Sequence, residues 1–413
     1  MRVTRRQLLE MAALIVAAPR GLHAAIQAGD KTGLDAIVLR ASDTIRAYSA
    51  EGFHRTATAV DRASADALLA RARATGAAAS LEPFDLSRVD PITAHLQLGA
   101  ERIPGLPMFD SGLFTGIAGV SGKIGPVGSD HAIGWTRIAP NAEAALRKMR
   151  DGSRHRAIVA VTMGGKPGLC PVNAGWFSQP FGPPVLQVSS EALPMLEALA
   201  PQAEAQVVAR VSQRKAQAFN VIAEITGARP ELPPVCVMTP RSGWHANASE
   251  RGGGLVCWLE TMRAVRASSC RRTVKFIASS GHELGHLGLH DYLRRTPALA
   301  RDAYAWVHFG ANIGASTGDT GMTPSDDRLR DAALRALAPY GLDTIRQSQA
   351  AQVAGEAATI KEAGGRFISF IGANAWFHNP NDLWPDTVDV AAVARFARAA
   401  GDLTVSLASP PAS

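Results

Sequence analysis

The sequence predicts an α/β protein with a mostly parallel central sheet and helices on both of its faces, interrupted by a β-rich insert. From residue 219 onward, short apolar runs alternate with stretches of helical length, and this alternation is typical of βαβ units with parallel strands. Between residues 105 and 214, glycine and proline are frequent and strand-like runs dominate. At 413 residues, 46% of them hydrophobic, the chain is long enough for more than one domain.

The first 28 residues resemble a twin-arginine export signal. Arg5 and Arg6 precede an apolar run at 11–18, and small residues suited to cleavage follow at 24–28. An amphipathic first helix is the alternative, because Glu10 interrupts the apolar run. A signal implies an exported protein, in the periplasm or another extracytoplasmic place. The apolar run is too short to cross a bilayer, and no other stretch is long enough, so no membrane span is expected.

Charge and cysteine content give no indication of a nucleic-acid-binding protein or of a protein with a C-x-x-C zinc or redox motif. The net charge is +7, but the first 28 residues contribute +3 of it, and the remaining +4 is too small to indicate a nucleic-acid partner. The four cysteines lack the C-x-x-C spacing of a structural zinc or redox motif. We therefore expect small core residues, with one disulfide as the open alternative.

The predicted elements define a discontinuous α/β domain at 29–104 and 215–405, the insert at 105–214 and a tail at 406–413. The domain opens with a helix at 34–50, a helix at 65–74 that Asp61 can cap, and a strand at 79–84. Strands are predicted in the insert at 157–161 and 184–188, and after it at 220–225, 234–238, 273–278, 304–309 and 366–371. Later helices are predicted at 142–149, 191–198, 254–267, 283–294, 326–338, 351–363 and 388–400.

Residues 282–286 contain the pattern H-E-x-x-H. On a helix this pattern brings His282 and His286 onto one face as zinc ligands, with Glu283 as general base. A zincin also needs a third ligand, but Leu289 and Tyr292 stand where a metzincin has its glycine and third histidine. A break at 279–281 also places His282 at the end of a strand, where open α/β sheets keep their sites. The zincin interpretation remains an alternative.

Three turns together resemble the zinc aminopeptidases of the M28 family. They are the glycine-rich turn at 243–254, the turn at 279–288 and the loop at 376–384. In that family a strand ends in H-x-D, a loop with a bridging Asp opens a helix, a strand ends in a Glu-Glu pair, a later strand ends in Asp, and a last loop supplies His. The segment 105–214 looks like the protease-associated (PA) insert of such enzymes, which would flank the cleft and limit which substrates enter.

The resemblance implies a site in which several ligands are altered. Arg241 stands in the H-x-D turn, and Asn312 lies where the later Asp is expected. Glu250 takes the place of the bridging Asp, and Arg251 follows it in place of Asn. His282 takes the place of the catalytic base, and Glu283 that of the ligand next to it. His378 takes the place of the last ligand, with Asp382 beside it and His245 nearby.

From the resemblance we expect an exported M28-like hydrolase that acts on a peptide or other small amide. At most one zinc ion is expected, held by Glu283, His378, Glu250 and His245, with His282 taking a proton from the metal-bound water. Asp382, Arg241, Arg251 and Asn312 would support the site or contact the substrate. The alternatives are a site rebuilt for an anion or for metal-free acid/base chemistry by Glu283 and His282, a non-catalytic homologue that acts as a binding protein, and an H-E-x-x-H zincin.

Overall fold

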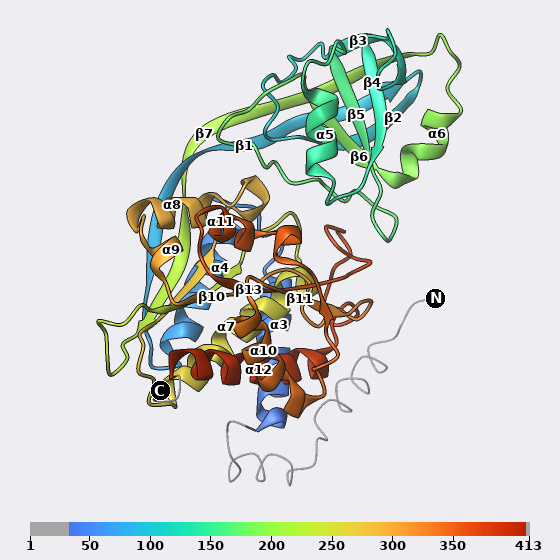
Figure 1. Cartoon of the computed structure of the whole chain (residues 1–413). Coiled ribbons are helices and arrows are strands. Elements are labelled where there is room, and N and C mark those ends of the chain that lie inside the picture. Colours follow the sequence, from blue (N-terminus) through green and yellow to red (C-terminus); the bar gives the residue numbers. More distant parts are fainter. Residues whose placement is uncertain (1–32, 410–413) are drawn as a thin grey trace, which may run out of the picture.

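The computed structural model describes residues 33–409, so the predicted export signal lies outside it. Figure 1 shows a larger α/β lobe and a smaller β-rich lobe, connected by the long strands β1 (Ala78–Leu98) and β7 (Glu204–Ile225). The sheet runs in the order β1-β2-β6-β5-β4-β3-β7-β9-β8-β10-β13-β11-β12. Both lobes therefore belong to a single hydrogen-bonded series of strands.

The centre of the larger lobe is a parallel sheet, as predicted. Its core strands are β8 (Val235–Pro240), β9 (Val274–Ser279), β10 (Ala305–Phe309) and β13 (Phe367–Gly372), and all of their mutual pairings are parallel. β7 joins β9 antiparallel, and β11 (Thr320–Pro324) joins β13 antiparallel, with the short β12 (Arg346–Gln347) beside it. Parallel core strands direct all of their carboxyl ends to one edge of the sheet, which is where the site lies.

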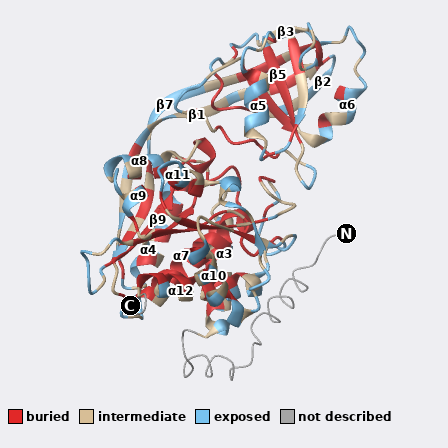
Figure 2. Ribbon diagram, viewed as in Figure 1, coloured by how far each residue is buried: buried red, intermediate tan, exposed pale blue. Residues whose placement is uncertain are grey.

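Helices cover both faces of this sheet, because each core strand is apolar on both sides. One face carries α3 (Leu34–Ala50), α4 (Ala59–Arg73), α7 (Ala248–Arg266), α10 (Asp327–Leu337) and α12 (Val390–Ala408). The other face carries α8 (Leu287–Arg295), α9 (Leu299–Asp302) and α11 (Glu356–Glu362). Figure 2 shows that the buried residues concentrate between these layers. α12 continues to Ala408, past the predicted domain end at residue 405.

Helix α7 passes so close to its neighbours that it needs glycine. A Cβ on Gly253 would lie 1.8 Å from the carbonyl oxygen of Ile313, and one on Gly252 would lie 2.8 Å from the side chain of Ile45. This helix begins at Ala248, six residues earlier than predicted, because the glycines that suggested a loop are packed inside it. The consequence is that Glu250 and Arg251 stand in its first turn.

The smaller lobe is β-rich, as predicted, but it does not form a separate sheet. β1 and β7 pair over almost their whole length, so the strands predicted at 79–84 and 220–225 are ends of much longer ones. The other elements of the lobe are β2 (Glu101–Pro107), β3 (Val120–Pro126), β4 (Ile133–Ile138), β5 (Ala157–Thr162), β6 (Val185–Ser189), α5 (Glu143–Arg150) and α6 (Leu193–Glu197). The middle of β7 is polar and exposed, which concealed its strand character in the sequence.

Two further predictions are corrected. The predicted helix at 283–294 is a 3-10 turn at His282–Leu284 followed by α8, and the helix predicted from residue 351 begins at Glu356. Cys170, Cys236, Cys257 and Cys270 are free and buried, as small core residues are. Among residues 33–409, no helix combines the length and the apolarity that crossing a membrane requires.

Candidate binding site at the carboxyl ends of the parallel strands

The turns after β8, β9, β10 and β13 meet at one edge of the sheet and supply the predicted site residues. Four non-glycine residues in or next to these turns have a positive φ: Asn247 (51°), His286 (61°), Asn312 (67°) and His378 (57°). Such conformations cost free energy and tend to concentrate at functional sites. The backbone therefore identifies the same edge of the sheet as the sequence did.

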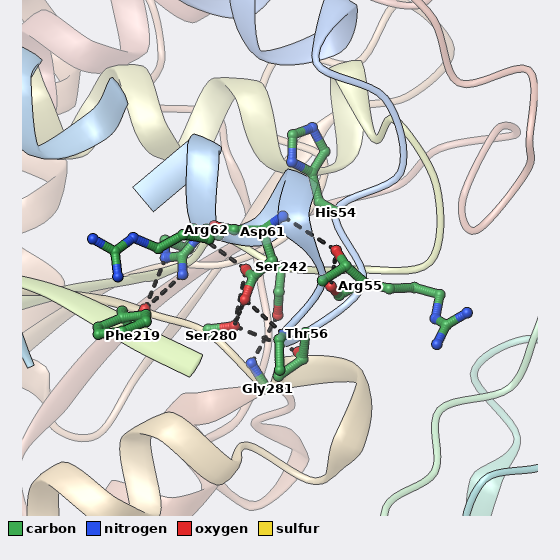
Figure 3. Close-up of polar contacts among 12 residues, drawn as sticks. His54, Arg55, Thr56, Asp61, Arg62, Phe219, Ser242, Ser280 and Gly281 are labelled. Atoms are coloured by element: carbon green, nitrogen blue, oxygen red, sulfur yellow. Dashed lines mark hydrogen bonds and ion pairs between the residues drawn. The ribbon is translucent and has the colours of Figure 1, made fainter. Parts of the chain in front are cut away.

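Both carboxylate oxygens of Glu283 are hydrogen-bonded to residues that are not among the predicted ligands. Its Oε1 accepts hydrogen bonds from the backbone N–H of Thr56 (2.8 Å) and from the Thr56 hydroxyl (2.7 Å), and its Oε2 accepts one from the Ser242 hydroxyl (2.7 Å). Thr56, Ser242, Ser280 and Gly281 lie together in Figure 3. Glu283 thus ties the turn after β9 to the segment before α4, and its predicted role as a metal ligand and general base has no geometric support.

The H-E-x-x-H pattern does not form a zincin helix. His282 begins the 3-10 turn, and His286 is the left-handed residue that precedes α8, so the two histidines do not stand one turn apart on a continuous helix. Their rings still lie 4.9 Å apart between centroids, and Nδ1 of His286 approaches the Thr359 hydroxyl at 3.5 Å. The alternative zincin ligand pair is therefore corrected: two left-handed glycines, Gly281 and Gly285, bend the chain.

Arg241 points away from the centre of the site. Its guanidinium pairs with Asp61 (Nη1 to Oδ1, 2.9 Å) and donates to the backbone oxygens of Asp61 and Phe219. Asp61 also accepts hydrogen bonds from the Ala57 N–H and the Ser280 hydroxyl, so it does not cap α4 as predicted; Thr58 does. Both Arg241 and Asp61 are buried, and this fully bonded ion pair holds α4 against the turn after β8.

Glu250, Arg251 and His378 form the centre of the site. Nη2 of Arg251 lies 2.7 Å from Oε1 of Glu250, and Nε2 of His378 lies 3.4 Å from the same oxygen. Burial by itself would raise the pKa of Glu250, but Arg251 and His378 outweigh it and lower that pKa to about 2. All three side chains are at most 1% exposed. The centre is therefore a buried carboxylate–guanidinium pair with an imidazole beside it.

Two more predicted histidines border this centre. Burial lowers the pKa of His245 to about 4, and the nearby His378 contributes to this. Burial lowers the pKa of His282 well below its usual value, and the charge of Arg251 lowers it further. Both imidazoles are thus neutral near pH 7. They retain slight exposure, 8% for His245 and 9% for His282.

The structure adds Glu356, which had no role in the predicted site, and places His308, which the sequence puts with His245 and His282 near the positions where the family keeps acids. Glu356 is fully buried at the start of α11; its Oε1 accepts from the Ser279 hydroxyl and lies 3.7 Å from Nδ1 of His282. His308 contacts the Ser369 hydroxyl through Nδ1 at 2.8 Å. Glu356 is the first glutamate after Glu283 in the sequence. This long interval without a glutamate could have drawn attention to Glu356. The predicted helix start at residue 351 instead placed Glu356 inside a helix, away from the strand-end turns.

Asp382 and Asn312 shape the site through hydrogen bonds. Asp382 accepts from the backbone N–H groups of Ser249 (2.9 Å) and Glu250 (3.0 Å) and from the Ser249 hydroxyl (2.6 Å). A carboxylate at this position satisfies free N–H groups at the start of α7. Asn312 donates to the Gly372 carbonyl and accepts from the Asn374 amide. Asp382 therefore fixes the helix turn that carries Glu250.

A segment of the smaller lobe lies over the site. We call residues 163–184, between β5 and β6, the covering loop. Nδ1 of His378 donates to the Pro171 carbonyl (2.5 Å), the Trp244 indole N–H donates to Asn173 (2.9 Å), and the Ala174 N–H donates to the Glu283 carbonyl (2.8 Å). The Asn379 amide donates to the Pro167 carbonyl at 3.0 Å. These bonds link both lobes directly above the strand ends.

The side chains at the strand ends do not fit a zinc ion. Within residues 33–409, no three His, Cys, Asp or Glu side chains are arranged to hold a metal. The predicted set of Glu283, His378, Glu250 and His245 is divided, because Glu283 is hydrogen-bonded elsewhere and the Arg251 cation contacts Glu250. A guanidinium at this distance repels a second cation and occupies the carboxylate that would bind it.

Comparison with known proteins relates the fold to a group of enzymes. No protein-family model and no curated protein sequence matches the chain. Among solved structures, BSAP, a zinc aminopeptidase from Bacillus subtilis, matches with a TM-score of 0.74 and 16% identity over 91% of this chain and 96% of that one. An aminopeptidase from Aneurinibacillus sp. strain AM-1 matches with a TM-score of 0.70 and 15% identity over 92% and 97%. A peptidase M28 precursor from Shewanella amazonensis gives 0.71 and 14% over 92% and 97%. The chain therefore has the fold of M28 zinc aminopeptidases.

Proposed function

We propose that this protein is a metal-independent binding protein with an aminopeptidase fold, which recognises a small peptide-like ligand at the strand ends and does not hydrolyse it. The contact between Arg251 and Glu250 carries this proposal, because it puts a fixed cation where the family resemblance expects a metal. A buried guanidinium cannot be displaced by zinc without leaving an uncompensated charge, which costs about 3–5 kcal/mol.

The groups that could act as a general base support the same proposal. Glu283 accepts three hydrogen bonds and offers no free oxygen toward the centre. His282 is a weak base because burial and Arg251 lower its pKa well below the usual range. A general base works best when its pKa lies near the working pH. Neither residue has the properties that peptide hydrolysis at neutral pH requires.

The test is an assay of aminoacyl p-nitroanilides by the full-length protein, with added zinc and with chelator. The expected result is no turnover above that of the Glu250→Gln and His378→Ala variants. Zinc-dependent turnover that both variants lose would overturn the proposal and restore the M28-type hydrolase. Unfolding curves of the variants would separate loss of a site from loss of the fold.

A second candidate function is metal-free hydrolysis, and one observation favours it. Nδ1 of His282 lies 3.7 Å from a carboxylate oxygen of the buried Glu356, and this arrangement could orient the imidazole as a base. Turnover that persists in chelator and disappears in His282→Ala would establish this candidate in place of the binding protein.

The proposal includes export and a role for the smaller lobe. We assign residues 1–28 as a twin-arginine signal, so the mature protein would be extracytoplasmic. Replacing Arg5 and Arg6 by lysine is expected to retain the protein in the cytoplasm, which fractionation and N-terminal sequencing would reveal. The smaller lobe would act as a PA-like wall, and the hydrogen bonds of the covering loop to the site support this role.

A further inference from the structure

The covering loop closes the strand-end site. Of the five side chains at its centre, the most exposed are His282 at 9% and His245 at 8%, and Glu250, Arg251 and His378 are at most 1% exposed. The loop is hydrogen-bonded to the turns after β8, β9 and β13. A ligand can therefore reach the centre only when the covering loop leaves these turns.

The covering loop is anchored to the strands of its own lobe. The Cys170 N–H donates to the hydroxyl of Thr162 at 3.0 Å, and the Val172 N–H donates to the side-chain oxygen of Gln187 at 2.7 Å. Thr162 ends β5, Gln187 lies in β6, and all four residues are fully buried. Because these bonds join the loop to both strands, the loop and the smaller lobe move together.

We call the contact between the covering loop and the larger lobe the seam. A Cβ on Gly165 would lie 2.8 Å from the Cα of Ala375, and one on Gly285 would lie 2.5 Å from the carbonyl oxygen of Gly175, so the two backbones meet closely. The apolar cluster that spans the seam has five buried residues, against thirteen in one cluster of the smaller lobe alone. An interface with so few apolar residues opens at a lower free energy than either lobe unfolds.

The lobes are connected by a two-stranded ribbon, formed by residues 85–91 of β1 and 211–217 of β7 (Figure 1). On either side of it, β7 pairs with β9 and with β3, but among residues 33–409 no third strand joins the ribbon itself. β7 is exposed at five of the six positions 212–217, and the strand register shifts after Pro91. Two-stranded ribbons twist more strongly than wider sheets and are less stable. The ribbon can therefore bend while the sheet of each lobe stays intact.

We propose that the smaller lobe is a gate over the strand-end site. It pivots on the ribbon, the seam opens, and the covering loop moves away together with β5 and β6 while both lobes stay folded. The structure in Figure 1 is the closed state of this gate. The gate controls entry to the site whether the ligand is bound or hydrolysed there, so it does not depend on the proposed function.

Hydrogen exchange of individual amides in the full-length wild-type protein, followed by NMR, tests the gate. The Ala174 N–H donates across the seam to the Glu283 carbonyl, whereas the N–H groups of Cys170 and Val172 donate within the smaller lobe. Opening of the gate exposes the first and keeps the other two protected. The Ala174 amide is therefore expected to exchange at least roughly 100-fold faster than those of Cys170, Val172, β5 and β9.

Variants at the seam shift the same equilibrium. Gly165→Ala places a methyl group against the larger lobe and should raise the Ala174 exchange rate about 5- to 100-fold, because overpacking disfavours the closed state. Gly116→Ala is the matched control in the same lobe; its added Cβ has nothing within 4 Å, so the rate should not change. Asn173→Ala removes the bond to Trp244 and should raise the rate about 3- to 10-fold. Circular dichroism verifies the fold of each variant, and the comparison of amides in the wild type needs no variant.

The result that supports the gate is fast exchange of Ala174 alone, raised further by Gly165→Ala and not by Gly116→Ala. Exchange of Ala174 as slow as that of β5 and β9 would overturn it, because the seam would then open only on unfolding. Equally fast exchange of Ala174, Cys170 and Val172 would overturn it in favour of fraying of the loop alone. A rate that Gly165→Ala leaves unchanged, or that Gly116→Ala raises equally, would also contradict it.

Discussion

Two buried arginine–carboxylate pairs of residues 33–409 lie at the same edge of the sheet, and they differ in how completely they are bonded. Asp61 and Arg241 are 2.9 Å apart, and both also bond to backbone groups or to Ser280. Glu250 and Arg251 are 2.7 Å apart as an ion pair with His378 3.4 Å from the same carboxylate oxygen, but beyond these ionic contacts neither carboxylate oxygen and neither terminal nitrogen has a hydrogen-bond partner. The first pair is built for stability. The second retains bonding capacity that no other part of the described protein uses.

The largest effect is expected when the first pair is broken. Arg241→Met leaves the Asp61 carboxylate buried without its partner and removes the bonds to Phe219, so unfolding free energy should fall by about 3–5 kcal/mol. Urea unfolding followed by tryptophan fluorescence measures this. The double variant Asp61→Asn with Arg241→Met should recover part of the loss. A loss below about 1 kcal/mol in the single variant would show that this pair is not structural.

A somewhat smaller effect is expected from Glu283→Gln. The amide nitrogen of the new side chain would face a donor, either Thr56 or Ser242, and one of three hydrogen bonds would be lost. We expect a loss of about 2–3 kcal/mol in unfolding free energy. If Glu283 instead held a metal and had no structural part, the substitution would leave the unfolding free energy of the metal-free protein unchanged.

The stability of the protein is also expected to depend on pH, because His54 is buried. Burial lowers the pKa of His54 to about 3, and its ring stacks on Tyr48. Between pH 6.5 and 3 the unfolded chain takes up a proton at this position and the folded chain does not, so stability falls as the pH falls. From pH 6.5 to 5 the contribution is about 2 kcal/mol. His54→Phe should remove that part of the slope, and an unchanged slope would assign the dependence to other groups.

The smallest effect on stability is expected from replacing the second pair as a whole. The double variant Glu250→Gln with Arg251→Met removes both buried charges, so unfolding free energy should change by less than about 1 kcal/mol or increase. The same variant should lose binding of the peptide-like ligand of the proposed function. A loss of several kcal/mol would place Glu250 and Arg251 with Asp61 and Arg241 as structural groups.

Much of the fold could be predicted from the sequence, because the elements of the larger lobe have strong local patterns. The apolar runs that became β8, β9, β10 and β13 are short, buried and bounded by turns, and these are signals that a single sequence carries well. The shared strands could not be predicted in full. The exposed polar middle of β7 is stabilised by its pairing with β1, a contact between residues more than a hundred positions apart.

The candidate site could be located from the sequence but its roles could not be assigned. The strand-end turns do meet, and Glu250, Arg251, His378, His245 and His282 lie together as expected for such turns. Motif correspondence placed Glu283 among the ligands, but its orientation depends on Thr56 and Ser242, which are distant in sequence. The direction of Arg241 depends in the same way on Asp61. The orientations of Glu283 and Arg241 thus depend on side chains from distant segments of the sequence. A local sequence motif does not contain these partners.

The most direct test of the central claim is a titration of zinc into the full-length wild-type protein and into His378→Ala, with the bound metal also measured after desalting. The account predicts that the two proteins retain the same amount of zinc, well below one equivalent, because Arg251 occupies Glu250 and Glu283 is bonded elsewhere. Retention of one equivalent by the wild type, lost in His378→Ala, would contradict it.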